Sequence, residues 1–99
     1  MVIRILDHIE RASTYDDGEV IYRLICDPIA RRETVVLSFD GVLAVPSAFV
    51  NAALVRLLES VPYEVVRQSL KIVGSTRQIN ELIKSRFEFV LTSASRTIV

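Results

Sequence analysis

Apolar residues recur along this chain at two spacings, one typical of strands and one typical of helices. Two short runs are rich in β-branched and aromatic residues, Thr34–Phe39 and Leu70–Val73, and we predict a strand at each. A third predicted strand is Met1–Leu6, which is interrupted only by Arg4. Because Thr34–Phe39 is almost continuously apolar, it is expected to be the central strand, covered on both faces of the sheet.

A helical pattern begins at about Asp17, where Asp16 offers an N-cap and Glu19 completes the spacing of a capping box. Its apolar positions recur at helical spacing and predict one buried face: Val20, Ile21, Leu24, Ile25 and Ile29. Pro28 is expected to kink or end this helix, since proline removes one hydrogen bond and crowds the preceding turn.

A second predicted helix, Ala48–Ser60, is apolar nearly all round. Such a helix needs cover beyond the sheet, from a neighbouring helix, a terminal segment or a second copy of the protein. The segment Tyr63–Arg67 is either one helical turn or loop. A third helix is expected after the turn Gly74-Ser75, with Thr76 as its cap.

The C-terminal part of the chain leaves alternatives open. Residues Phe87–Leu91 either extend the last helix or form a strand, and Ile98–Val99 either fray in a flexible tail from about residue 92 or pair with an edge strand. The alternation of strands and helices predicts an α/β fold in one domain over residues 1–99. We expect a mostly parallel or mixed central sheet of about four strands, packed by helices.

Composition and charge exclude several classes of protein. The 99 residues suffice for one core, and 51% of them are hydrophobic, with 12 basic and 12 acidic side chains. This balance gives no global field toward nucleic acid or an anionic membrane, and Arg31 and Arg32 are interpreted as a solvated helix end. No apolar run is long enough to span a bilayer, and the first residues lack the apolar centre of a secretory signal. We therefore expect a cytoplasmic protein that binds neither nucleic acid nor membrane.

Residues that carry metal or catalytic chemistry are scarce. His8 is the only histidine and Cys26 the only cysteine, and their spacing matches no zinc site. The three glycines form no phosphate-binding loop. Ser47, His8 and Asp40 could meet in space, but they have no spacing signature of nucleophilic catalysis. We expect no metal, no cofactor and no enzyme, and a small hydrolase or transferase is the less favoured alternative.

The junction between the predicted central strand and the following helix is the most informative stretch. Asp40-Gly41 breaks the strand, Pro46 precedes the helix, and Ser47 stands at its start. Free backbone N–H groups at such a junction hold anions, phosphoserines or partner loops. The first interpretation of Ser47 is an N-cap, worth about 1 kcal/mol. The second is a phosphorylation site, where the added charge would act on a docked partner.

The run Tyr22–Glu59 resembles the bacterial STAS-like domain family of unknown function. The resemblance rests on an aromatic-arginine pair, a following proline, an aspartate-glycine strand end and a serine-phenylalanine helix start: Tyr22, Arg23, Pro28, Asp40, Gly41, Ser47 and Phe49. It implies a fold similar to STAS domains. In the wider superfamily, anti-sigma factor antagonists carry a serine at this junction that a partner kinase phosphorylates, and Ser47 matches it by register. Pro46, Ala48 and Phe49 depart from the residues around that serine.

The resemblance and the residues together predict a regulatory protein-protein interaction module without catalysis. Its expected contact surface comprises Asp40, Gly41, Pro46, Ser47 and Asn51, with Ser47 as the candidate phosphorylation site. By superfamily analogy, the protein partner is a kinase-like ATPase or a sigma-factor regulator. The structural alternative is a homo-oligomer built on the apolar helix Ala48–Ser60.

Overall fold

The computed structural model describes the backbone of residues 1–97 and the side chains of residues 1–92. Strands and helices alternate as the sequence predicts: β1 (Val2–Arg4), α1 (Tyr15–Ala30), β2 (Val35–Ser38), α2 (Ser47–Ala53), α3 (Tyr63–Ser69), β3 (Leu70–Val73) and α4 (Arg77–Thr97). Two 3₁₀ helices complete the order, η1 (Ile5–Asp7) and η2 (Val55–Glu59). The predicted α/β fold class is confirmed.

The sheet of residues 1–97 has three parallel strands in the order β1-β2-β3, where about four were predicted. β2 is central, as predicted, with Val36 opposite Val2 on one side and Leu37 opposite Ile72 on the other. The N-terminal strand is shorter than predicted, because the chain turns into η1 and carries Ile5 into the core.

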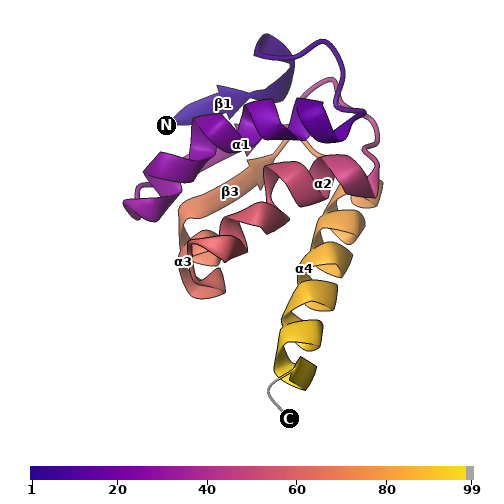
Figure 1. Cartoon of the computed structure of the whole chain (residues 1–99). Helices are drawn as coiled ribbons and strands as arrows, with labels where there is room; N and C mark the ends of the chain where they lie inside the picture. The colour runs from indigo at the N-terminus through magenta and orange to yellow at the C-terminus, as the bar shows by residue number, and fades with distance from the viewer. Residues whose placement is uncertain (98–99) are drawn as a thin grey trace.

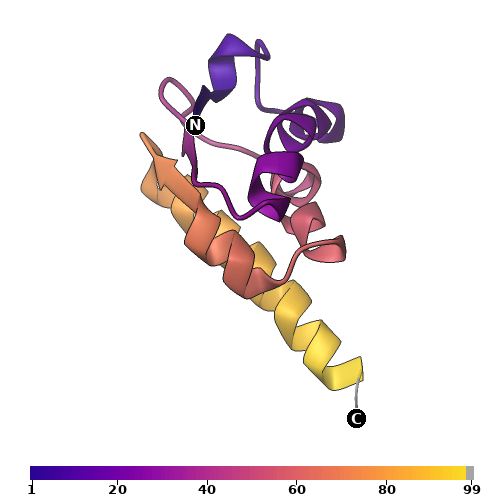
Figure 2. The same cartoon turned by 90° about the vertical axis from the view of Figure 1, so that its left-hand side faces the viewer.

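One face of the sheet is covered and the other is open. α1 and α2 lie side by side on the covered face (Figure 1), and in Figure 2 the strands are seen nearly end-on with these helices on one side. On the opposite face Val2 is 74% exposed and Val73 is 43% exposed. The prediction that β2 is buried on both faces is therefore wrong, since alternate residues of β2 are only partly buried.

α1 packs closely on α2 because Gly18 has no side chain. A Cβ atom at Gly18 would lie 2.6 Å from the backbone oxygen of Phe49 and 2.7 Å from the Cβ of Ala52. The α1 residues Ile21, Ile25 and Ile29 are fully buried beside this contact. Val20 is 40% exposed and does not belong to the buried stripe, because it lies one residue, about 100° of helical turn, before Ile21.

The capping box of α1 lies two residues earlier than predicted. Thr14 Oγ1 accepts a hydrogen bond from Asp17 N (3.1 Å), and Asp17 Oδ2 accepts one from Thr14 N (3.0 Å). Asp16 is therefore a first-turn residue and not the cap. Both pairs have the spacing of a capping box, so the pattern alone does not distinguish them. The helix continues through the buried Pro28 and ends at Ala30.

The predicted helix Ala48–Ser60 is two elements, which is a correction to the sequence interpretation. α2 ends at Ala53, Leu54 (φ −119°, ψ −52°) is its C-cap, and η2 follows. The tighter 3₁₀ turn repeats every three residues, so it brings Leu54 and Leu57 to the same side, where both are fully buried.

The later elements settle two alternatives. α3 begins at Tyr63, which selects the helical alternative for that segment. α4 includes Phe87–Leu91 and continues to Thr97, so these residues extend the helix and form no strand. Figure 1 shows α4 leaving the sheet at the end of β3 and extending past the body of the domain. The expectation for Ile98–Val99 lies outside the described residues. No helix within residues 1–97 is long and apolar enough to cross a membrane.

Candidate functional site

The predicted site residues lie along the segment that follows the carboxyl end of the central strand. Because β1, β2 and β3 are parallel, the segments after them begin at the same edge of the sheet. This edge is the usual location of binding sites in open α/β sheets. It brings together Arg4 from β1, Asp40 and Gly41 after β2, and the turn at Gly74 after β3.

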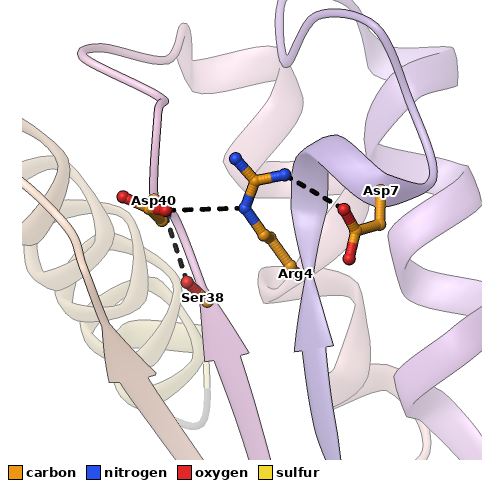
Figure 3. A network of polar contacts seen from close by, with 4 residues as sticks. All are labelled: Arg4, Asp7, Ser38 and Asp40. Carbon is orange, nitrogen blue, oxygen red and sulfur yellow. Dashed lines mark hydrogen bonds and ion pairs between the residues drawn. The ribbon is translucent and has the colours of Figure 1, made fainter.

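Asp40 takes part in a surface network of charges (Figure 3). The Arg4 guanidinium lies between two carboxylates, with Nη1 3.0 Å from Asp7 Oδ1 and Nε 3.5 Å from Asp40 Oδ2. Asp40 N donates a hydrogen bond to Ser38 Oγ (3.2 Å). The hydrogen bond to Asp7 is the main cause that raises the pKa of Arg4. The network orients Asp40, but all three charged side chains are open to solvent.

The turn after β2 depends on a glycine at Gly41. Its φ of +86° lies in the left-handed region, where a side chain would be strained. A Cβ atom there would also lie 2.8 Å from Cδ1 of Leu6. The predicted role of Asp40-Gly41 as the strand break is confirmed, since β2 ends at Ser38 and a turn follows.

The loop between this turn and α2, residues 42–46, is held at two points by residues near the start of α4. Thr76 Oγ1 donates a hydrogen bond to the backbone oxygen of Leu43 (2.9 Å). The Gln78 side chain accepts from Val45 N and donates to Val45 O, both at 3.4 Å. Thr76 Oγ1 also accepts from Ile79 N (3.3 Å), which confirms its predicted role as a helix cap. The loop backbone is therefore hydrogen-bonded to the start of α4 at Leu43 and at Val45.

Leu43 projects from this fixed loop into solvent. Its side chain is 80% exposed, although Val42 and Val45 on either side of the tip are buried. Leucine that is so fully exposed loses the free energy that burial of its side chain would provide, roughly 2 kcal/mol. An apolar side chain that is displayed on a tethered backbone is suited to insertion into a partner.

Ser47 is the first residue of α2, and Pro46 occupies the N-cap position. The interpretation of Ser47 as the N-cap is therefore wrong by one position, and no side-chain hydrogen bond caps this helix. Both Pro46 and Ser47 are exposed, whereas Phe49 is fully buried. Ser47 is therefore an exposed residue, four positions after the exposed Leu43.

Asn51 lies one helical turn after Ser47, on the same face of α2. Its Oδ1 accepts a hydrogen bond from Arg86 Nε (3.1 Å), which joins α2 to α4. The guanidinium of Arg86 also lies over the ring of Phe89, 4.9 Å from its centroid. Asn51 is half-buried, so its contribution to the exposed surface is smaller than that of Pro46 or Ser47.

Two groups of residues qualify the sequence interpretation. Tyr22, part of the aromatic-arginine pair, lies under the guanidinium of Arg56 (4.5 Å to the ring centroid) and not at the loop. Arg56 in turn pairs with Glu19 (3.3 Å), so this cluster joins α1 to η2.

Among the described residues, no three His, Cys, Asp or Glu side chains are grouped so as to hold a metal ion.

Comparison with known proteins gives one match. A family model described as the STAS-like domain of unknown function (DUF4325) matches residues 17–80. The matched segment contains all but the first two residues of α1, then β2, the loop of residues 42–46, α2, η2, α3, β3 and the start of α4. No curated protein and no solved structure matches the chain.

Proposed function

The chain belongs to the STAS-like domain family of unknown function, and on this premise we propose that it is a regulatory module that binds a protein partner. The contact surface is the loop from Asp40 to Ser47, which we call the docking loop. The observation that carries the proposal is the 80% exposure of Leu43 on a backbone held by Thr76. A loop that is already ordered loses little conformational entropy when a partner binds, which favours affinity.

The chemistry of the docking loop fits a partner with a small apolar pocket. Leu43 supplies the anchor, and the exposed residues Ala44 and Pro46 supply small apolar contacts around it. The ion pair between Arg4 and Asp40 lies near one end of the loop and provides a charged rim. An apolar centre with a polar rim is the usual anatomy of a protein interface. The proposed module therefore acts by binding its partner and not by catalysis.

Ser47 is the proposed switch of this interaction. Its hydroxyl is exposed and caps no helix, so phosphorylation would not remove a cap of the domain. A phosphate on Ser47 adds a charge of about −1.5 to −2 four residues after the apolar anchor Leu43, and it would disfavour insertion of the loop into an apolar pocket. Ser47→Asp is expected to weaken partner binding, whereas Ser47→Ala should bind as the wild type does.

By superfamily analogy, we propose a kinase-like ATPase or a sigma-factor regulator as the partner. The alternative, a homo-oligomer on the apolar helix, is less favoured because that apolar surface is used within the domain. Six of its residues are fully buried: Phe49, Val50, Ala52, Ala53, Leu54 and Leu57. A second copy is not needed to cover them.

Affinity capture from the native host tests the docking loop. Wild-type protein, Leu43→Asp and Val20→Asp are used as baits, because Val20 is also an exposed apolar residue but lies on α1. We expect a captured protein to be lost with Leu43→Asp and retained with Val20→Asp. Equal capture by all three baits would contradict the proposal. Mass spectrometry of the protein from its host then shows whether Ser47 carries a phosphate.

A further inference from the structure

β3 is an edge strand whose outer side pairs with no strand of residues 1–97. Its register with β2 places Leu70 opposite Val35 and Ile72 opposite Leu37, so these two side chains lie on the covered face of the sheet. Lys71 and Val73 alternate with them and lie on the open face. Unlike the fully buried Val35 and Leu37, Leu70 and Ile72 are only half-buried. The covered face is thus incomplete at this edge.

An apolar hollow of about 310 Å³ lies beside this incomplete edge. Its apolar lining comes from α3, β3 and α4: Val66, Leu70, Ile72, Ile83, Phe87 and Leu91. Figure 1 shows α4 beginning beyond the carboxyl end of β3 and extending away from the strand. A further strand beside β3 would direct every second side chain into this hollow, because alternate residues of a strand point to the same face.

The charges around the hollow indicate the chemistry of such a strand. Arg67 and Lys84 line it and Lys71 stands in the middle of β3, whereas Glu88 is the one acidic residue in the lining. None of these three cations forms an ion pair with a side chain of residues 1–92. A residue directly opposite Lys71 in an added strand would share its face, and opposite charges at such positions stabilise a sheet.

A second copy of β3 is a poor occupant of the same edge. Antiparallel self-pairing that keeps Leu70 opposite Ile72 on the covered face also places Lys71 opposite Lys71 of the second copy. Like charges directly opposite each other destabilise a pair of strands. Lysine on an edge strand is a common protection against self-association. The charge at this edge therefore favours an acidic partner over a second copy.

We propose that β3 binds an extended segment of a partner protein by strand addition. The segment carries apolar residues at the positions that face Leu70 and Ile72 and an acidic residue opposite Lys71. Backbone hydrogen bonds provide affinity, and the hollow and Lys71 provide specificity. The β1 edge is less suited, because β1 has three residues and turns at once into η1. This surface is separate from the docking loop and does not depend on it.

Fluorescence anisotropy with the full chain tests this proposal. The probe is a labelled eight-residue peptide of alternating valine and glutamate, and the comparison peptide alternates valine and lysine. We expect the glutamate peptide to bind about fivefold more tightly than the lysine peptide. Lys71→Glu should reverse this preference. Because Lys71 is exposed, the variant should fold normally and give the circular dichroism spectrum of the wild type. A variant that keeps the original preference would overturn the proposal.

Backbone methylation separates strand addition from simple attraction of charges. Two versions of the glutamate peptide are made, each methylated at every second amide nitrogen. One version lacks the N–H donors that would face β3, and the other lacks the N–H donors that would face away from it. One version should lose binding and the other should retain it. Equal effects of the two versions, or no binding of the unmodified peptide, would contradict strand addition. Sedimentation of the wild type and of Lys71→Glu gives their oligomeric states. If the wild type were a dimer and the variant a monomer, a second copy would occupy the edge, and this would also contradict the proposal. Leu43→Asp should leave peptide binding unchanged, so the two proposed surfaces fail independently.

Discussion

The docking loop and the β3 edge both expose apolar residues to solvent, but they do so in different ways. In the docking loop one leucine projects outward from a backbone that Thr76 and Gln78 hold in place. At the β3 edge the apolar residues surround a hollow, and the missing part is a strand. The loop offers a side chain to a partner's pocket, whereas the edge offers a pocket and backbone hydrogen bonds to a partner's side chains. The two surfaces therefore select partners of different shape.

The largest expected effect on stability comes from a change in the packing of α1 on α2, which supports both surfaces. Gly18→Ala places a Cβ atom where Phe49 O and Ala52 Cβ leave no room, so α1 and α2 must separate. We expect a loss of about 3 kcal/mol in the free energy of unfolding, as overpacking of a core produces. Urea denaturation measures it. Arg23→Ala, on the exposed side of α1, is the control and should stay within about 0.5 kcal/mol of the wild type.

A change at Thr76 should separate the two surfaces. Thr76→Val removes the hydrogen bond to Leu43 O and the cap of Ile79 N, and it should cost about 1 to 2 kcal/mol. Amide hydrogen exchange should accelerate in residues 42–46 because the loop loses an anchor. Binding of the valine-glutamate peptide at β3 should be unchanged. If the loop amides kept their wild-type protection, the loop would not depend on this tether.

The capping box of α1 predicts that the stability of the fold depends on pH. The residue responsible, Asp17, belongs to neither proposed surface. Hydrogen bonds from Ser13 N and from Thr14 to the Asp17 carboxylate lower its pKa, with the Ser13 bond as the main cause. A lowered pKa means that this stabilisation is present above the unfolded-state pKa, near 3.9, and is lost as the pH falls through the lower folded-state value. Wild type should therefore lose more stability than Asp17→Asn during acid titration below about pH 4. Parallel titration curves would contradict this role.

The smallest expected effect on stability concerns the charged rim of the docking loop. Asp40→Asn removes an exposed ion pair with Arg4, and such pairs contribute about 0.2 to 1 kcal/mol at most. Thermal unfolding in low and high salt measures it, since screening by salt should erase the difference. A salt-independent loss would mean that Asp40 stabilises the turn in another way.

The sequence predicts the strands well and the helix boundaries less well. β2 and β3 lie within the predicted runs, because a short β-branched run has few alternatives in a small α/β domain. The break at Leu54 has no local signal, since apolar residues at this spacing suit a continuous helix as well as α2 followed by η2. The burial of Leu54 and Leu57 in the tertiary core decides between them.

The candidate site shows the same division. Asp40, Gly41, Pro46 and Ser47 are found from local turn and helix-start chemistry, and all four are exposed in the structure. Leu43 could not be found this way, because a leucine between Val42 and Val45 has the pattern of a core residue. Its exposure depends on Thr76 and Gln78, each 33 residues from the loop position that it binds. Such a contact depends on the tertiary fold and leaves no local pattern.

Site-specific photo-crosslinking in the native host tests the central claim, that the docking loop contacts a protein partner. A photoreactive residue is placed at position 43, at position 47 or, as the control, at position 20 on α1. We predict one crosslinked protein that is shared by positions 43 and 47 and absent at position 20. No product at 43 and 47, or the same product at all three positions, would contradict it.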